Sequence, residues 1–230
     1  MARFVITGTG TDIGKTVLAA GLCGLIGADY WKPVQTGLAH DLPNPMAGGR
    51  RQGLSPMDGS RAYLPVAGTD SAEVEHLSGQ PVHPEAYLLR EPLSPHRAAE
   101  LNGVEIDPAD LTPPDADRLV VEGAGGVLVP VTRDILFADL FAQWQIPVIL
   151  VATTGLGTIS HSLSALESLR ARQVPVHGIA FVGEDNPDNL RTICELGRVR
   201  LLGRLPFLEQ LDRFSLAAAM HEQFDPEDFR

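Results

Sequence analysis

Short apolar runs alternate along the chain with longer segments in which apolar residues recur every three or four positions. The short runs predict buried strands, and the recurring pattern predicts helices with one apolar face. The predicted strands are residues 3–7, 30–34, 119–122, 148–151, 179–182 and 201–205. The predicted helices are residues 14–26, 70–77, 95–102, 138–144, 162–172 and 187–196.

This alternation predicts the fold class. Strands that are apolar throughout fit a parallel sheet covered on both faces, and intervening helices imply right-handed βαβ units. We therefore predict an α/β fold with a mostly parallel sheet of about seven strands and helices on both faces. We found no repeat or linker, so residues 1–230 are predicted to form a single domain.

One segment, residues 37–69, interrupts the alternation with closely spaced prolines and glycines. A loop of this length inside a compact domain is usually functional or disordered. The sequence leaves two interpretations open: a mobile cover or a small ordered excursion.

Charge and composition exclude several classes of function. The formal net charge of −11 argues against a nucleic-acid or anionic-membrane surface, because both require clustered positive charge. The chain begins without a secretory pattern, and its longest later apolar run, residues 148–152, is too short to span a bilayer. Cys23 and Cys194 are far apart, as expected for unpaired thiols in a reducing compartment. We expect a cytoplasmic protein.

The strongest chemical signal is the sequence Gly-Thr-Gly-Thr-Asp-Ile-Gly-Lys-Thr over residues 8–16. It follows the first predicted strand and opens a helix, which is the context that a phosphate-binding P-loop requires. The spacing of its glycines is one residue longer than in the usual motif. Lys15 is predicted to neutralise the β- and γ-phosphates of a nucleoside triphosphate, and the Thr16 hydroxyl to bind Mg²⁺.

Two further segments place charged residues at predicted strand ends. Lys32 lies in Trp-Lys-Pro-Val-Gln-Thr-Gly over residues 31–37, and Glu122 lies in Leu-Val-Val-Glu-Gly-Ala-Gly-Gly over residues 119–126. Ligands of open α/β sheets bind at the carboxyl ends of strands. A carboxylate there is suited to Mg²⁺, and a cation to a transferring phosphoryl group. Lys15 and Lys32 are the only lysines of the chain.

Asp70 has two possible roles. It is predicted either to N-cap a helix, with Glu73 at the third helical position, or to contact the metal. The residues themselves leave both open.

Together these segments resemble dethiobiotin synthetases. The lengthened P-loop, the Lys-Pro-Val stretch and Val-Glu-Gly-Ala-Gly-Gly are typical of that family. So are Glu-Pro-Leu-Ser-Pro-His at 91–96, Pro-Val-Ile-Leu-Val at 147–151 and Gly-Arg-Leu-Pro-Phe at 203–207, and the six occur in the family's order. The resemblance implies a P-loop NTPase fold and a homodimer. It also implies that ATP and Mg²⁺ serve to form the ureido ring of dethiobiotin from 7,8-diaminopelargonate and CO₂, through a carbamate and its phosphoric anhydride, in biotin biosynthesis.

The resemblance also implies roles for individual residues. Lys32 and Lys15 are the implied catalytic residues, and Thr16, Asp70 and Glu122 the implied metal ligands. The implied nucleotide-binding residues are Asp12, Ile13, Gly14, Lys15, Thr16, Val17, Glu122, Gly123, Ala124, Gly125, Glu184, Asp185, Leu205, Pro206 and Phe207. The implied substrate-binding residues are Thr36, near the substrate nitrogens, and Gly157, Thr158 and Ser160, which bind the tail carboxylate across the dimer interface.

The chain differs from the family just after the strand predicted over residues 179–182. Relatives often have Asn-Asp there, whereas this chain has Glu184 and Asp185. An ionised Glu accepts hydrogen bonds but cannot donate one, so other nucleoside triphosphates besides ATP are possible co-substrates. Asn186 is the alternative reader of the base.

Two other functions remain as alternatives. A partitioning-type regulatory P-loop ATPase has a signature lysine early in the P-loop, where this chain has Gly10. A cobalamin-type amidoligase normally has an appended glutaminase domain, which we do not expect within these 230 residues.

Overall fold

The computed structural model describes residues 2–38 and 63–230, so most of the proline- and glycine-rich segment 37–69 lies outside the described residues. The strands are β1 (Ala2–Gly8), β2 (Asp29–Trp31), β3 (Val34–Gln35), β4 (Val82–His83), β5 (Tyr87–Leu88), β6 (Arg118–Gly126), β7 (Val148–Thr153), β8 (Val176–Val182) and β9 (Leu201–Leu205). The α-helices are α1 (Lys15–Ile26), α2 (Asp70–Ser78), α3 (Pro95–Asn102), α4 (Phe137–Trp144), α5 (Thr158–Ala171), α6 (Pro187–Gly197) and α7 (Arg213–Gln223). Short 3₁₀ turns are formed by Pro108–Asp110 and Pro226–Phe229.

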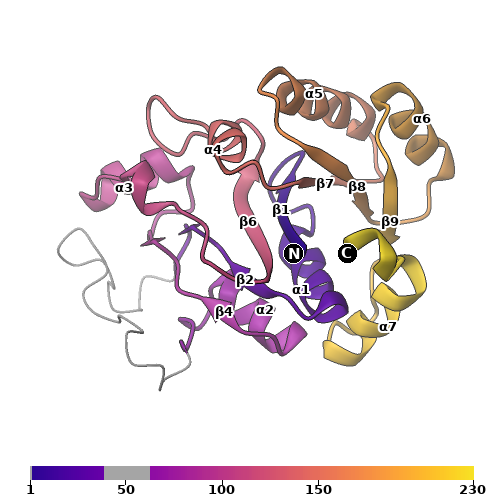
Figure 1. The fold of residues 1–230 in the computed structure, drawn as a ribbon, viewed down its shortest axis with the longest axis horizontal. Coiled ribbons are helices and arrows are strands. Elements are labelled where there is room, and N and C mark those ends of the chain that lie inside the picture. Colours follow the sequence, from indigo (N-terminus) through magenta and orange to yellow (C-terminus); the bar gives the residue numbers. More distant parts are fainter. Residues whose placement is uncertain (1, 39–62) are drawn as a thin grey trace.

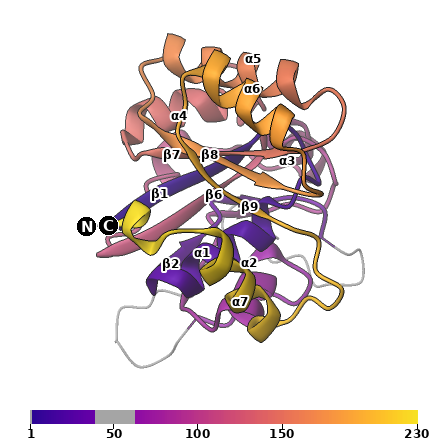
Figure 2. The same cartoon turned by 90° about the vertical axis from the view of Figure 1, so that its right-hand side faces the viewer.

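Seven strands form one sheet in the order β4-β2-β6-β1-β7-β8-β9, and every pairing in it is parallel. Helices lie on both sides of the sheet: α4, α5 and α6 on one face, and α1, α2 and α7 on the other (Figures 1 and 2). The predicted α/β fold class is confirmed. A separate parallel pair, β3 and β5, lies beside the sheet.

Strand alternation divides the core into two clusters, one on each face of the sheet. In β6, Leu119 and Val121 belong to the cluster under α4 and α5, whereas Val120 belongs to the cluster under α1 and α7. Burial on both faces explains why these strands are apolar throughout. Among residues 2–38 and 63–230, no helix combines the length and the hydropathy needed to cross a membrane.

Two differences between the predicted and the observed strands concern the predicted site. The strand predicted over residues 30–34 is divided into β2 and β3, because Pro33 has no N–H with which to continue a ladder; its carbonyl instead accepts hydrogen bonds from the Ala86 and Tyr87 N–H groups. The strand predicted to end at Glu122 continues to Gly126, which pairs with Gly8 after a register irregularity. Glu122 therefore lies within a strand and not at its end.

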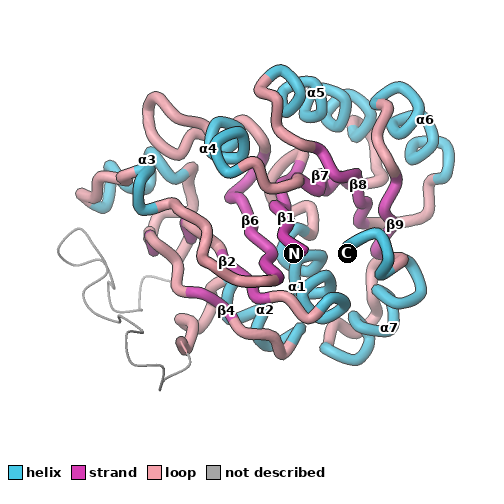
Figure 3. Tube along the Cα trace, viewed as in Figure 1, coloured by secondary structure: helices cyan, strands magenta, loops and turns pink. Residues whose placement is uncertain are grey.

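Other elements were missed or shortened in the prediction. The helix predicted to begin at residue 162 begins at Thr158, after Gly157, whose φ of 89° is in the left-handed region that favours glycine. The two-residue strands β4 and β5 and the helix α7 were not predicted. Figure 3 shows the short strand β4 between connecting loops.

Candidate active site

The loops after β1, β3 and β5 and the last part of β6 surround a cavity of about 750 Å³. Since parallel strands end at the same edge of a sheet, this is where the predicted residues were expected to meet. The cavity is lined by Thr11, Asp12, Ile13, Gly14, Lys15, Thr16, Val17, Lys32, Gln35, Thr36, Gly37, Asp70, Pro92, Leu93, Ser94, Pro95, Glu122, Ala124, Gly125 and Val129. The structure thus brings together the P-loop, both lysines, both predicted carboxylates and part of segment 91–96.

The P-loop turns into α1 at Gly14, which has a φ of 88°. A Cβ atom there would lie 2.8 Å from Val182 Cγ1, so a larger residue would be both strained and crowded. The first N–H groups of a helix lack intrahelical partners and attract anions. The loop therefore offers backbone donors for phosphate.

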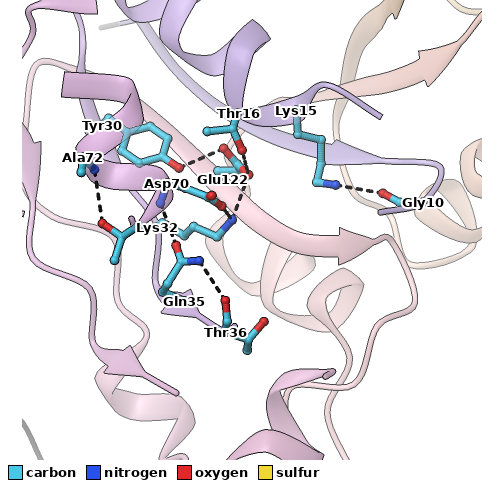
Figure 4. Close-up of polar contacts among 11 residues, drawn as sticks. Gly10, Lys15, Thr16, Tyr30, Lys32, Gln35, Thr36, Asp70, Ala72 and Glu122 are labelled. Carbon is cyan, nitrogen blue, oxygen red and sulfur yellow. Dashed lines mark hydrogen bonds and ion pairs between the residues drawn. The ribbon is translucent and has the colours of Figure 1, made fainter. Parts of the chain in front are cut away.

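Lys15 lies along this loop, and its Nζ donates to the Gly10 carbonyl over 2.8 Å (Figure 4). Burial lowers the pKa of Lys15, although the nearby Glu122 carboxylate opposes that effect. A bound anion would favour the charged ammonium form, which the loss of hydration on burial disfavours.

Lys32 is buried and forms ion pairs with Asp70 and with Glu122, the latter over 3.0 Å. Burial by itself would lower the pKa of Lys32, but Glu122 and Asp70 outweigh it and raise the pKa above its usual value. The ammonium group therefore stays charged at neutral pH.

Glu122 is the most enclosed acid of the cavity, with 1% of its surface exposed. Its Oε1 accepts hydrogen bonds from Thr16 Oγ1 and Lys32 Nζ, each over 3.0 Å. Its Oε2 accepts a hydrogen bond from the Tyr30 hydroxyl over 2.9 Å (Figure 4). Burial and the adjacent Glu122 raise the pKa of Tyr30 well above its usual value, so the phenol keeps its proton.

Asp70 does not N-cap α2, contrary to one of its two predicted roles. The cap is Thr69, whose Oγ1 accepts from the Ala72 N–H, and Asp70 is the first helical residue. Thr69 suits the cap because it is extended (φ −93°, ψ 160°). The Asp70 side chain is thereby free to pair with Lys32, and its N–H donates to Gln35 Oε1 over 3.1 Å.

The oxygen atoms here fit a magnesium ion. Carboxylate and hydroxyl oxygens are the ligands that hard divalent cations prefer, and Mg²⁺ usually keeps several waters and adds substrate phosphates. In the described part of the chain, no group of three or more His, Cys, Asp or Glu could form a complete metal cage. The two carboxylates and the Thr16 hydroxyl beside the P-loop match a site in which the protein supplies few ligands and water and phosphate supply the others.

A second, mostly apolar cavity of about 330 Å³ lies on the other side of the P-loop. It is lined by Asp12, Ile13, Gly14, Val17, Thr153, Val182, Leu205, Pro206, Phe207, Leu208 and Leu211. The predicted nucleotide-binding segment 205–207, at the end of β9, therefore lies beside the P-loop. Leu211, just before α7, was not predicted.

The two candidate readers of the base lie outside the lining of this cavity. Glu184 is exposed, and the Asp185 carboxylate lies 3.6 Å from Arg204 Nε. Asn186 N-caps α6, and its amide also donates to the Thr154 carbonyl over 3.1 Å. The side chain of Asn186 is thus engaged on both sides of its amide.

The remaining predicted residues lie in different places. Thr36 lines the larger cavity, whereas Gly123 faces α4, where a Cβ atom would lie 2.9 Å from Phe141 Cζ. Residues 157–160 lie outside the lining of both cavities. Thr158 Oγ1 donates to the Thr153 carbonyl over 2.5 Å, and Ser160 is exposed.

Tyr30 and Gln35 are site residues that the sequence reasoning missed. A signal for Tyr30 was present, since it lies two residues before Lys32 and side chains two apart on a strand share a face. The role of Gln35 had no comparable signal, because its partner Asp70 is distant in sequence.

Comparison with known proteins places these features in a family. A family model described as an AAA domain matches residues 2–215. The ATP-dependent dethiobiotin synthetase BioD of Novosphingobium aromaticivorans is 51% identical over 100% of this chain and 100% of its own length. The protein of the same name from Sphingopyxis alaskensis is 48% identical, with the same coverage of both chains. Among solved structures, a ParA family ATPase from Chlorobium tepidum has 13% identity and a TM-score of 0.45, with 96% of this chain and 92% of that chain covered.

Proposed function

The chain belongs to the ATP-dependent dethiobiotin synthetase family, and from that premise we propose that it closes the ureido ring of dethiobiotin from 7,8-diaminopelargonate and CO₂. It is a ligase of biotin biosynthesis. The partitioning-type ATPase and the cobalamin-type amidoligase are not favoured, since the curated relatives compared with it are dethiobiotin synthetases along their full length.

The observation that best supports this proposal is the meeting of Lys15, Lys32, Asp70 and Glu122 at one cavity. Phosphoryl transfer needs fixed positive charge beside the phosphates. Lys15 supplies it from the first turn of α1, and Lys32 from the residues just after β2. Ion pairing keeps Lys32 protonated, so it is ready to meet the charge that develops on the transferring group.

Thr16, Asp70 and Glu122 are the residues that would hold Mg²⁺, as their oxygen donors allow. The ion would neutralise charge on the β- and γ-phosphate oxygens. The backbone of residues 10–14 and Lys15 would bind the phosphates, and Ile13, Val17 and Leu205–Phe207 would enclose the base in the apolar cavity.

The reaction follows from the reactivity of a carbamate. One substrate amine adds to CO₂ and loses a proton to give a carbamate, whose oxygen then attacks the γ-phosphorus of ATP and releases ADP. The neighbouring amine next attacks the carbamate carbon and loses a proton, and inorganic phosphate leaves as the five-membered ring closes. Thr36 and Lys32 lie on the cavity wall where the amines and the carbamate would be held, and fixing both amines supplies the proximity term.

The test is a phosphate-release assay in which 7,8-diaminopelargonate and bicarbonate are omitted in turn. We expect phosphate release only in the complete mixture with Mg²⁺, together with a product of the mass of dethiobiotin. Release that is unaffected by either omission would rule out this reaction, and stimulation by DNA or by glutamine would favour one of the alternatives.

A further inference from the structure

The buried phenol of Tyr30 contacts the most enclosed carboxylate of the cavity. We propose that Tyr30 is a positioning residue for the divalent cation: its hydroxyl fixes the rotation of the Glu122 carboxylate so that Oε1 faces the P-loop. This inference rests on the proposed function, in which Glu122 is a metal ligand.

The carboxylate of Glu122 has no covalent reason to hold one orientation. The last torsion of a glutamate is broad and roughly two-fold, so the two oxygens exchange places at little cost. Here they have different partners: Oε2 accepts from Tyr30, while Oε1 accepts from Thr16 and Lys32. Removing the Tyr30 donor leaves Oε2 buried without the partner that selects this orientation.

The sheet holds the phenol in place. Strand β2 pairs with β6 so that Tyr30 lies opposite Val120, and Val120 and Glu122 point to the same face because they are two residues apart. Tyr30 is fully buried in the cluster beneath α1, among side chains that include Phe4 and Leu22. The ring cannot swing away without disturbing that packing.

A neutral donor suits this position better than a second cation would. Lys32 already offsets the negative charge of Glu122 and Asp70. The phenol orients the carboxylate and leaves its net charge available to a divalent cation. Mutation of a residue that hydrogen-bonds to a metal ligand typically lowers metal affinity by about 10- to 100-fold.

The experiment measures Mn²⁺, as a spectroscopic substitute for Mg²⁺, binding to the complex of the protein with ADP. Electron paramagnetic resonance gives the free ion in the parent, Tyr30→Phe, Glu122→Gln and Tyr87→Phe. For Tyr30→Phe we expect about 10- to 100-fold weaker Mn²⁺ binding and unchanged metal-free ADP binding. We also expect a kcat that recovers towards the parent value at high Mg²⁺. Tyr87→Phe is the matched control, since it removes another buried hydroxyl, bonded to Asp110 Oδ2 over 2.7 Å and outside the cavity lining.

The outcomes separate this inference from the proposed function. If Glu122→Gln weakens Mn²⁺ binding and Tyr30→Phe does not, Tyr30 is not a positioning residue. If Tyr30→Phe only lowers the unfolding temperature, as Tyr87→Phe would, the role of Tyr30 is structural and the inference is overturned. If Glu122→Gln itself binds Mn²⁺ normally, the metal assignment within the proposed function fails.

Discussion

The two lysines differ in what surrounds them. Lys15 curls over the P-loop and donates to the Gly10 carbonyl, whereas Lys32 is held between the carboxylates Asp70 and Glu122. Because the two ammonium groups have different partners, we expect removal of each lysine to affect a different step of the reaction.

We predict that Lys32→Ala lowers kcat by about a hundred- to a thousand-fold with a small effect on nucleotide binding, because its charge acts mainly in the transition state. Lys15→Ala should weaken nucleotide binding as well as the rate. Steady-state kinetics and ADP titration distinguish the two. Circular dichroism checks folding, because Lys32→Ala leaves two carboxylates without their cation, and Lys32→Arg is the variant that keeps the charge. Normal turnover in Lys32→Ala would remove the catalytic assignment.

We predict that residues just after β8, which lie outside the lining of the apolar cavity, set the base preference. The cavity that would receive the base is lined mainly by apolar side chains, and apolar walls do not distinguish the hydrogen-bonding edges of bases. We therefore predict weak discrimination among ATP, CTP and GTP in the parent. Glu184→Asn should increase the preference for ATP by about tenfold, the value of a weak bidentate contact.

Relative kcat/KM for the three nucleotides provides the measurement. Glu195→Gln is the control, because it makes the same change of charge at an exposed acid of α6 outside the lining of both cavities. Strong preference for ATP in the parent, unchanged in Glu184→Asn, would show that Glu184 does not read the base.

At the scale of elements, α3 is tied to the loop before α4 by charge. Glu100 accepts hydrogen bonds from Arg133 and Arg97, and these bonds lower its pKa to about 2 from 4.5. A carboxyl whose pKa is lower in the folded state stabilises the fold above its unfolded pKa and loses that effect as the pH falls. The loss should therefore occur between pH 4.5 and about 2.

We predict that Glu100→Gln lowers the unfolding temperature slightly at pH 6 and that the difference from the parent disappears towards pH 2. The effect should be small and should shrink in high salt, since the pair is solvent-exposed. Thermal unfolding at several pH values provides the measurement. Glu105→Gln, in the loop after α3, is the control for loss of an exposed acid. A difference that persists unchanged to pH 2 would contradict the assignment.

How well the sequence predicted an element depended on the length of its pattern. The long apolar strands and the P-loop context were enough to predict β1, β6 and β7, because burial on both faces leaves an unbroken pattern. Strands β4 and β5 have two residues each, too few for any periodicity. Only three residues of α7 are buried, so its apolar face is short. Contacts between distant segments, such as Gln35 with Asp70, arise from the fold and leave no local trace.

At the scale of the whole molecule, one sheet separates two cores and gathers the chemistry at its carboxyl edge. The single domain over residues 1–230 and the cytoplasmic location stay predictions from the sequence. The segment at residues 155–160 follows β7 but lies outside the lining of the larger cavity. A role in substrate binding would therefore require another copy of the chain.

We predict a homodimer in which this segment faces the site of its partner. Leu156 is fully exposed between two glycines, and Ser160 is exposed within the first turn of α5. The N–H groups at the start of that helix suit a carboxylate, such as the tail of the substrate. Leu156→Asp should give a monomer in sedimentation velocity and raise the KM for 7,8-diaminopelargonate, while ADP binding stays at the parent value. Leu196→Asp, at an exposed leucine of α6, is the control and should stay dimeric. An active monomer of the parent would contradict the prediction, because the tail site would then be complete within one chain.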